Sequence, residues 1–245
     1  MWAPVHLAGA LALFYWNSSV LNSFLVGYVL VSGLGIAVGY HRFYSHRSFK
    51  TTKLTQVLLT WCGVLGCQGK PIYWASIHRT IHHPHADTAL DLHTPSKGWW
   101  HAYMGWMFKI DPSTAKLKGV GDLVRDPIIV WFHRNYYLVL WGTWIIVGIL
   151  SPHVLLGLAL SQAWAFHQEN LIDTFCHSRG WWGYRSYDTR DNSMNVPILG
   201  YLTWGQGWHN NHHHQAYPYN YGRRWWEIDL GSLLVELVRV RDVLL

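Results

Sequence analysis

The sequence predicts an all-α integral membrane protein, in which four transmembrane helices form two hairpins that carry a cytoplasmic helical cap. Composition is the first reason. Half of the 245 residues are hydrophobic and only 13% are charged, against about a quarter in an average globular protein. The placement of charge is the second reason, because no Lys or Arg occurs before Arg42 or between Arg134 and Arg179. Lipid can cover surfaces with so little charge, so both gaps are expected to lie in a bilayer.

The first gap predicts the first hairpin. Residues 2–40 carry no charged side chain, and they are too many for one span of about 20 residues. The polar stretch at 17–19 divides them into spans at about 2–18 and 20–40. No basic segment precedes the apolar run, so we expect a retained span at its start rather than a cleaved signal peptide.

The second gap predicts the second hairpin, with spans at about 131–150 and 152–167. Ser151 interrupts the apolar run, and Pro152 suits the first position of the helix that follows. A further apolar stretch at about 54–68 is too short to cross a bilayer as a helix. Lysines flank this stretch on both sides, so it is expected to lie in the membrane interface.

The basic residues predict the orientation. All 19 Lys and Arg fall within 42–134 and 179–241, and basic segments next to membrane spans face the cytoplasm. We therefore expect a cap formed by 41–130 and 168–245, with both termini on the cytoplasmic side of a single domain, 1–245. Basic charge on that face has a second interpretation, which is attraction of an acidic substrate head such as coenzyme A or a phosphate.

Histidines gather in three clusters that the spans would place on the same side of the membrane. The chain has 17 histidines, and the clusters read HxxxxH (41–46), HxxxHH (78–83) and HxxHH (209–213). Residues three or four apart share one face of an α-helix, so His78 and His82 should point the same way, as should the three histidines of the last cluster. The five-residue spacing of His41 and His46 predicts that a helix ends, kinks or unwinds between them.

These clusters predict a metal centre. Neutral imidazole is a preferred ligand of borderline transition metals, and eight clustered imidazoles are too many for one ion, which indicates two. Zinc sites usually close at four ligands, whereas iron accepts more nitrogen. The isolated histidines are interpreted as structural; they are His6, His101, His133 and His153. His85 and His93 follow the second cluster and are expected to orient ligands or the carboxylates Asp87 and Asp91.

The three histidine clusters and their flanking residues resemble the motifs of a known enzyme family. The motifs HRFYSH (41–46), HRTIHH (78–83) and WGQGWHNNHH (204–213) resemble the three histidine boxes of membrane fatty acyl desaturases, most closely the acyl-CoA Δ9 (stearoyl-CoA type) and bacterial branch. The resemblance runs from about Gly39 to Tyr217 and includes the runs GYHRFYSHRSFK, HADTALDLHTPSKGWWHAYMGW and YRSYDTRDNSMN. Three boxes in order, with matching flanks, make the resemblance specific.

The resemblance implies nine histidine ligands for two iron ions, with O2 as co-substrate. Carried over position by position, the ligands are His41, His46, His78, His82, His83, His177, His209, His212 and His213. His177 enters only through this comparison, in the run IDTFCH.

The sequence departs from the family pattern at three positions. The second box has one more residue between its first histidine and the HH pair. Asp173 stands where the family has an Asn that holds a water on one iron, so Asp173 either binds the metal directly or holds that water by a charged hydrogen bond. His214 follows the third box as an extra histidine.

The implied reaction is the O2-dependent introduction of a cis double bond into a saturated acyl chain, with acyl-CoA as the expected substrate and Δ9 as the expected position. Trp74, Trp204 and Trp208 are expected either to line an acyl tunnel or to anchor at the headgroup level. The cations expected to hold the substrate head are Arg42, Lys70, Arg79, Arg185 and Arg190.

The partners follow from what the chain lacks. It shows no flavin, haem or iron–sulfur motif, so electrons are expected from a separate ferredoxin or b-type cytochrome with its reductase, which the basic face could dock. Membrane lipids are the other expected partner, and nucleic acid is not.

One alternative function is a membrane di-iron hydroxylase or alkane-type monooxygenase. A metal transporter is another, but it needs coordinating groups within the spans, where 2–40 offers only His6 and 134–166 only His153.

Overall fold

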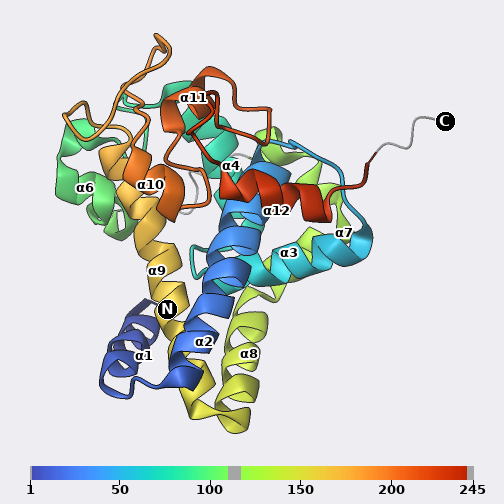
Figure 1. Ribbon diagram of the computed structural model, residues 1–245. Coiled ribbons are helices and arrows are strands. Elements are labelled where there is room, and N and C mark those ends of the chain that lie inside the picture. The colour runs from blue at the N-terminus through green and yellow to red at the C-terminus, as the bar shows by residue number, and fades with distance from the viewer. Residues whose placement is uncertain (1, 110–116, 242–245) are drawn as a thin grey trace.

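A computed structural model describes residues 2–109 and 117–241. Their regular structure is helical, and β-type pairing within them is limited to two isolated bridges, Tyr184–Asn195 and Asn195–Trp208. The all-α prediction is therefore confirmed for these residues. Figure 1 shows a bundle of α1, α2, α8 and the first half of α9 at one end, with the remaining elements gathered as a cap at the other end.

The first hairpin has the predicted link. Helix α1 (Trp2–Phe14) is followed by α2 (Ser18–Gly27), which continues directly into η1 (Tyr28–Ser45). The side chain of Asn17 accepts hydrogen bonds from the N–H groups of Ser19 and Val20, which is the usual way for Asn to start a helix. The polar stretch thus separates the helices because it caps the second one.

The second hairpin differs from the prediction at its start. The expected span 131–150 is two helices, α7 (Pro127–Arg134) and α8 (Tyr136–Leu150). After the short link at Ser151, α9 (Pro152–Phe175) begins at Pro152, as predicted, and the Ser151 side chain accepts from the N–H of Val154. Helix α9 also runs eight residues beyond the expected end at 167, so it carries the chain from the bundle into the cap.

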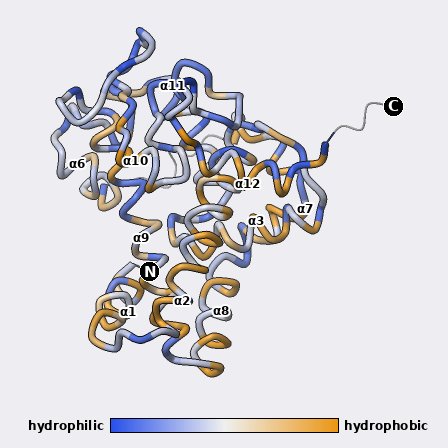
Figure 2. Tube along the Cα trace, viewed as in Figure 1, coloured by the Kyte–Doolittle hydropathy of each residue, from blue (hydrophilic) through white to orange (hydrophobic). Residues whose placement is uncertain are grey.

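The membrane prediction has partial support. Among the helices described, one, Ser18–Ser45, is long and apolar enough to cross a membrane, while α1 and α8 are apolar but shorter. At 13 residues, α1 rises about 20 Å, less than the hydrocarbon thickness of about 30 Å. Figure 2 shows that hydrophobic residues dominate α1, α2 and α8. The four-span arrangement remains a prediction.

Small residues allow the bundle helices to approach closely. Helix α9 packs along α1 and α2. A Cβ atom at Gly27 would collide with the Ser161 side chain, and one at Gly157 would collide with the main-chain carbonyl of Val20. Close packing of this kind is typical of helices that associate in lipid. This packing fixes the position of α9 relative to α2. It therefore also fixes the positions of η1 and of the end of α9, around which the cap is built.

The cap is built from short helices around the ends of η1 and α9. The predicted interfacial stretch 54–68 forms α3 (Lys53–Leu65), which lies across the bundle in Figure 1 and exposes Leu54 and Leu58. Residues 110–116 of the predicted cap lie outside the part that the structure describes. The other elements are α4 (Pro71–Ile77), η2 (His78–His82), α5 (His83–His85), η3 (Pro95–Lys97), α6 (Trp99–Tyr103), η4 (Gly105–Phe108), η6 (Leu117–Val120), η7 (Leu123–Arg125), α10 (Pro197–Leu202), α11 (His209–His214) and α12 (Leu230–Val238).

Candidate metal centre

The first two histidine clusters lie on π-helices. Elements η1 and η2 are wound with hydrogen bonds from residue i+5 to residue i, a rare form that recurs at functional sites. The N–H of His46 donates to the carbonyl of His41 at 3.1 Å, and the N–H of His83 donates to the carbonyl of His78. Helix η1 also ends at Ser45, so the expectation that a helix ends between His41 and His46 is confirmed, and the π-turn is what brings both rings together.

One group of five histidines follows from this winding. Their ligand nitrogen atoms all lie within 4.8 Å of one another. The Nε2 atoms of His46 and His78 are 2.8 Å apart, and those of His78 and His83 are 3.0 Å apart. The Nε2 atom of His212 completes the ring, at 3.1 Å from both His41 and His83.

A second group contains the other four implied ligands, again within 4.8 Å of one another: His82, His177, His209 and His213. The Nε2 atom of His209 lies 2.9 Å from that of His177 and 3.1 Å from that of His213. The structure thus brings together all nine histidines that the resemblance implies. His78 and His82 lie side by side, with ring centroids 5.5 Å apart, as the shared face predicts, but each joins a different group.

Both groups fit metal ions better than they fit hydrogen bonds. A neutral imidazole has a single N–H, so several Nε2 atoms aimed at one point cannot all be paired with each other. Two nitrogen ligands at about 2.1 Å from an ion are about 3.0 Å apart when the angle between them is 90°. The Nε2 separations of 2.8 to 3.1 Å match that spacing.

Burial keeps the imidazoles of His46 and His213 neutral. Burial, followed by the nearby His213, lowers the pKa of His46 to about 3. Burial also lowers the pKa of His213 to about 4, although Asp191 acts in the opposite direction. A neutral ring keeps a lone pair free for a metal. His177 differs: burial lowers its pKa, but the hydrogen bond and charge of Asp87 outweigh it and raise that pKa to about 9, so a metal that binds there must displace a proton.

Carboxylates and a carbonyl hold the outer nitrogen atoms of the four-histidine group. Asp87 Oδ2 lies 3.1 Å from His177 Nδ1, and Asp191 Oδ2 lies 2.8 Å from His213 Nδ1. The carbonyl of Gln206 lies 3.1 Å from His209 Nδ1. Partners of this kind fix the tautomer and direct Nε2 inward. The sequence led us to expect that His85 and His93 orient the carboxylates, whereas the structure pairs Asp87 with His177. Asp191 was not singled out, although its run YRSYDTRDNSMN was.

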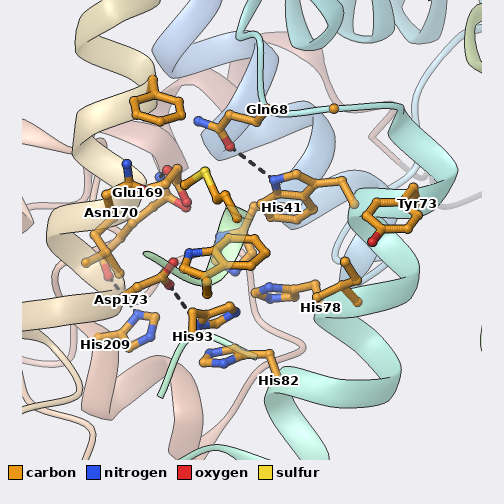
Figure 3. A pocket seen from close by; sticks show the side chains of 18 of the residues that line it. His41, Gln68, Tyr73, His78, His82, His93, Glu169, Asn170, Asp173 and His209 are labelled. Carbon is orange, nitrogen blue, oxygen red and sulfur yellow. Dashed lines mark hydrogen bonds and ion pairs between the residues drawn. The ribbon is translucent and has the colours of Figure 1, made fainter. Parts of the chain in front are cut away.

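A cavity of about 210 Å³ leads to the two groups. Figure 3 shows His41, His78, His82 and His209 at one end of it, with Gln68 towards the other. Tyr73 lies on one side of the cavity, and Glu169, Asn170 and Asp173 of α9 lie on the other (Figure 3). The apolar and aromatic lining residues are Trp2, Tyr73, Trp74, Ile77, Trp106, Met107, Phe166 and Ile172, of which Phe166 and Ile172 also belong to α9.

Of the three tryptophans expected to line a tunnel, the structure places only Trp74 on this cavity. Its ring stacks on His78 with centroids 5.0 Å apart. Trp204 instead donates from Nε1 to Ser32 Oγ at 3.0 Å. Trp208 is fully buried and donates to the carbonyl of Ile228 at 3.0 Å. Both therefore pack the protein interior, away from the cavity.

The expected head-group cations also need correction. Arg42 is completely buried, and its Nη2 lies 2.9 Å from both carboxylate oxygens of Asp229. Its other nitrogen atoms donate to the carbonyls of Tyr219 and Ala37. Arg42 therefore ties α12 and the segment before it to η1 and is closed to a substrate head.

Two further arginines have internal partners. Arg79 donates to the carbonyl of Ser45 at 2.9 Å and pairs with Asp122, and Arg185 donates to the carbonyls of Asp191 and Ser193. These contacts fasten the segments that carry His46 and Asp191. The remaining two cations are differently placed: Lys70 precedes α4 and adjoins Gly69 on the cavity, and Arg190 is exposed.

Two acids on α9 face the cavity. Asp173 does not join either histidine group; its Oδ1 lies 3.5 Å from His93 Nδ1. Glu169, one turn earlier, was missed in the sequence. Its Oε1 accepts from Gln206 at 2.6 Å and from Gln168 at 3.0 Å. Burial, and then the nearby Asp173, raises the pKa of Glu169 to about 7. The spacing of 169 and 173, one turn apart on α9 and continued by 177 just past its end, was the signal available.

Comparison with known proteins gives a consistent result. No protein-family model matches the chain. The chain is 35% identical over 242 residues to the sn-1 stearoyl-lipid 9-desaturase of Anabaena variabilis, covering 98% of this chain and 82% of that protein. It is 34% identical to the sn-1 stearoyl-lipid 9-desaturase of Synechocystis, covering 96% and 74%. It is 32% identical to the acyl-CoA 5-desaturase AL21 of Anemone leveillei, covering 92% and 70%.

Proposed function

This chain belongs to the fatty acyl desaturase family and is an enzyme of that class, and from this premise we propose that it introduces a cis double bond into a saturated acyl chain, using O2 and two histidine-bound iron ions. The observation that carries the proposal is the convergence of nine imidazoles into groups of five and four beside one cavity. When bound, iron would supply the activation of O2 and the abstraction of hydrogen from unactivated C–H bonds.

The chain's own contribution is placement. Tyr73, Trp74 and Ile77 form an apolar wall that ends at His78, and burial of each methylene group against such a wall stabilises the complex by about 0.8 kcal/mol. An acyl chain held there presents neighbouring methylene groups to both histidine groups. Correct placement of the reacting atoms is a large part of what an enzyme adds when the substrate offers no charge to hold.

The electron balance calls for a partner. Removal of two hydrogen atoms from the acyl chain yields two electrons and two protons, whereas reduction of O2 to two waters takes four of each. Two electrons and two protons must therefore come from outside the substrate. We propose a separate ferredoxin or b-type cytochrome as the electron donor, docked to the basic side of the cap, because opposite charges speed such encounters.

The identity of the substrate head has two candidates. The sequence resemblance favours acyl-CoA and Δ9. A lipid-bound chain is favoured by a separate observation, because the described lining of the cavity contains Glu169 and Asp173 but neither Lys nor Arg. The phosphates of coenzyme A bind best where cations converge. The names of the relatives include both stearoyl-lipid and acyl-CoA desaturases.

We also propose that both hairpins cross the membrane and place the cap on the cytoplasmic side. The basic residues outside 2–40 and 135–167 support this orientation. Support also comes from the exposed apolar side chains on the outside of the bundle, among them Leu7, Phe14, Ile145 and Ile149.

The test is expression in a host with a compatible donor, followed by double-bond mapping of acyl-lipids and acyl-CoA separately. New cis alkene at position 9 supports the proposal, and the pool in which it first appears identifies the head group. His209→Ala should abolish the alkene while the protein stays in the membrane, and His153→Ala, at an exposed site outside both groups, should not. Hydroxylated product would support the hydroxylase alternative. Metal movement across vesicles with unchanged acyl chains would support the transporter.

A further inference from the structure

An exposed aromatic stack lies on the cap beside the four-histidine group. His214, the extra histidine after the third box, is exposed, whereas the side chain of the proposed ligand His213 is only 1% exposed. The rings of His214 and Tyr187 are parallel, with centroids 3.9 Å apart and planes 4° apart. Figure 1 shows α11, which carries both histidines, at the end of the cap away from the bundle. The protein surface and a proposed metal ligand are therefore one residue apart here.

The loop that carries Tyr187 is fastened to α11. Asn210 is fully buried, and its Oδ1 accepts from the N–H groups of Ser186 and Tyr187, both at 2.8 Å. Its Nδ2 donates to the carbonyl of Tyr187 at 3.1 Å. Further along the same loop, Asp191 Oδ2 lies 2.8 Å from His213 Nδ1. The aromatic surface is therefore preformed, and its position relative to the four-histidine group is fixed by the same helix.

The two segments that meet at the stack are basic. Residues 185–191 and 209–224 together contain four arginines and two aspartates, a net charge of +2 with histidine neutral. Of the two aspartates, Asp191 is turned inwards with its side chain 11% exposed, and only Asp188 is fully exposed. Figure 2 shows α11 as mainly hydrophilic. A polar, positive surface of this kind favours a partner with an acidic surface.

Two of these arginines lie next to the stack. Arg190 is exposed and directly precedes Asp191. Arg223 Nη2 lies 3.5 Å from Oε1 of Gln215, the residue after His214. The Arg223 guanidinium also donates to the main-chain carbonyl of Asn220. In the part of the chain that the structure describes, neither guanidinium has a carboxylate partner, so both charges are available to another molecule.

The acyl cavity offers no comparable approach. Its described lining contains Glu169 and Asp173 but neither Lys nor Arg, so an acidic protein is repelled there. Tyr187 and His214 are not among the described residues that line the cavity. A protein can therefore contact the stack while an acyl chain occupies the cavity, and electron delivery does not compete with substrate binding.

We propose that Tyr187, Arg190, His214 and Arg223 form the docking surface for an acidic one-electron carrier protein. The inference rests on the proposed function, in which two electrons come from outside the substrate. At each encounter the carrier is oxidised by one electron and the metal centre gains one, so two encounters supply the pair, and the accompanying protons come from water. Electron-transfer complexes are typically small and transient, and the arginines speed such an encounter. The stack brings the carrier within one residue of His213, which matters because electron transfer slows steeply with distance.

The experiment measures binding rather than turnover. Purified full-length protein is titrated at low and at high salt with an oxidised acidic [2Fe–2S] ferredoxin and, separately, with the soluble haem domain of a b-type cytochrome. We expect at least one carrier to bind the wild type, and to bind it more weakly as salt rises. Arg190→Glu and Arg223→Glu should each weaken that binding by about threefold to tenfold at low salt, because attraction becomes repulsion. Arg125→Glu, at an exposed site outside the docking surface, is the matched control and should bind as the wild type does.

The aromatic stack is tested by His214→Ala. Because His214 belongs to neither histidine group, this variant should keep the metal content of the wild type. It should bind the carrier more weakly, and the loss should persist at high salt, because an aromatic contact is not screened by ions. A loss that disappears at high salt would remove the stack from the docking surface.

The proposal is overturned if neither carrier shows salt-sensitive binding to the wild type. It is also overturned if Arg190→Glu and Arg223→Glu both bind as the wild type does, or if Arg125→Glu weakens binding as much as they do. Because the titration needs neither O2 nor an acyl substrate, it does not depend on desaturase activity. The expected binding pattern in a protein that forms no alkene would support the docking surface and contradict the proposed function. Alkene formation with unchanged binding in both variants would do the reverse.

Discussion

The main-chain N–H of His46 donates to the carbonyl of His41 across 3.1 Å. This single bond decides which histidines meet. In an α-helix, residues five apart point to different sides, whereas the wider π-turn brings them closer to one face. The same i+5 bond joins His83 to His78. Two separate segments therefore each contribute two rings to the five-histidine group by the same backbone device.

The π-turn predicts how the second box responds to a change in length. Deletion of Thr80 leaves four-residue spacing between the present His78 and His83, which an ordinary α-turn keeps on one face. We expect this variant to retain both metals and to lose no more than about tenfold in desaturation, the lower end of the range for disturbed ligand orientation. Insertion of one Ala after Thr80 should abolish both metal retention and desaturation. Loss of metal in the deletion and retention in the insertion would contradict the role given to the π-turn.

Asp191 is expected to matter through His213. Its carboxylate lies 2.8 Å from His213 Nδ1, and loss of such a partner typically weakens metal affinity or activity by about 10- to 100-fold. Asp191→Ala should show that loss in a competition assay with a fluorescent chelator. Asp188→Ala, in the same loop but fully exposed, is the control and should bind as the wild type does. Unchanged affinity in Asp191→Ala would mean that His213 is oriented by other contacts.

Arg42 is expected to control stability rather than substrate affinity. Removal of one partner of a buried ion pair typically costs about 3–5 kcal/mol, and both Arg42 and Asp229 are completely buried. Arg42→Leu should therefore lower the thermal midpoint sharply in detergent. Lys70→Ala, at a site beside the cavity, should leave the thermal midpoint nearly unchanged. It should instead raise KM if the substrate head group binds next to Lys70. A stable Arg42→Leu protein with raised KM would restore Arg42 as a head-group residue.

Glu169 predicts a pH dependence of stability. Its pKa is raised from 4.5 to about 7 in the folded protein, so the folded state binds a proton that the unfolded state releases. The stabilisation is complete below pH 4.5 and is lost as pH rises to 7 and above, by about 3 kcal/mol at 1.4 kcal/mol for each pH unit. Thermal melts from pH 5 to 8 should show a decline in the wild type and a flatter profile in Glu169→Gln. Parallel profiles would rule out the titration of Glu169.

The sequence was informative where function is carried by local patterns. The capping residues Asn17 and Ser151 set the hairpin links, and the three boxes contain eight of the nine proposed ligands, all but His177, because metal chemistry restricts residue type. Each of these signals lies within a few consecutive residues. The division of the histidines into two groups could not be predicted from the sequence. His78 and His82 are neighbours that join different groups, and the π-turn that contains them depends on packing against the rest of the cap.

Long-range partners were also beyond the sequence. The pairing of Arg42 with Asp229 joins residues 187 positions apart, and nothing local to Arg42 distinguishes an internal arginine from one that holds a phosphate. Trp208 is similar, since its burial depends on Ile228 and the helices around it. Glu169 is different: its one-turn spacing from Asp173, in a helix otherwise short of charge, could have been noticed.

The continuity of α9 has a mechanical consequence. This helix of 24 residues packs against the first hairpin at Gly157 and ends one residue before the turn that carries His177. A helix resists stretching, so an axial slip in the bilayer is transmitted almost undiminished to His177. Coordination bonds tolerate errors of only about 0.2 Å. In the proposed membrane arrangement, the two hairpins must therefore be seated in register before the four-histidine group can close, and we expect correct insertion to precede metal loading.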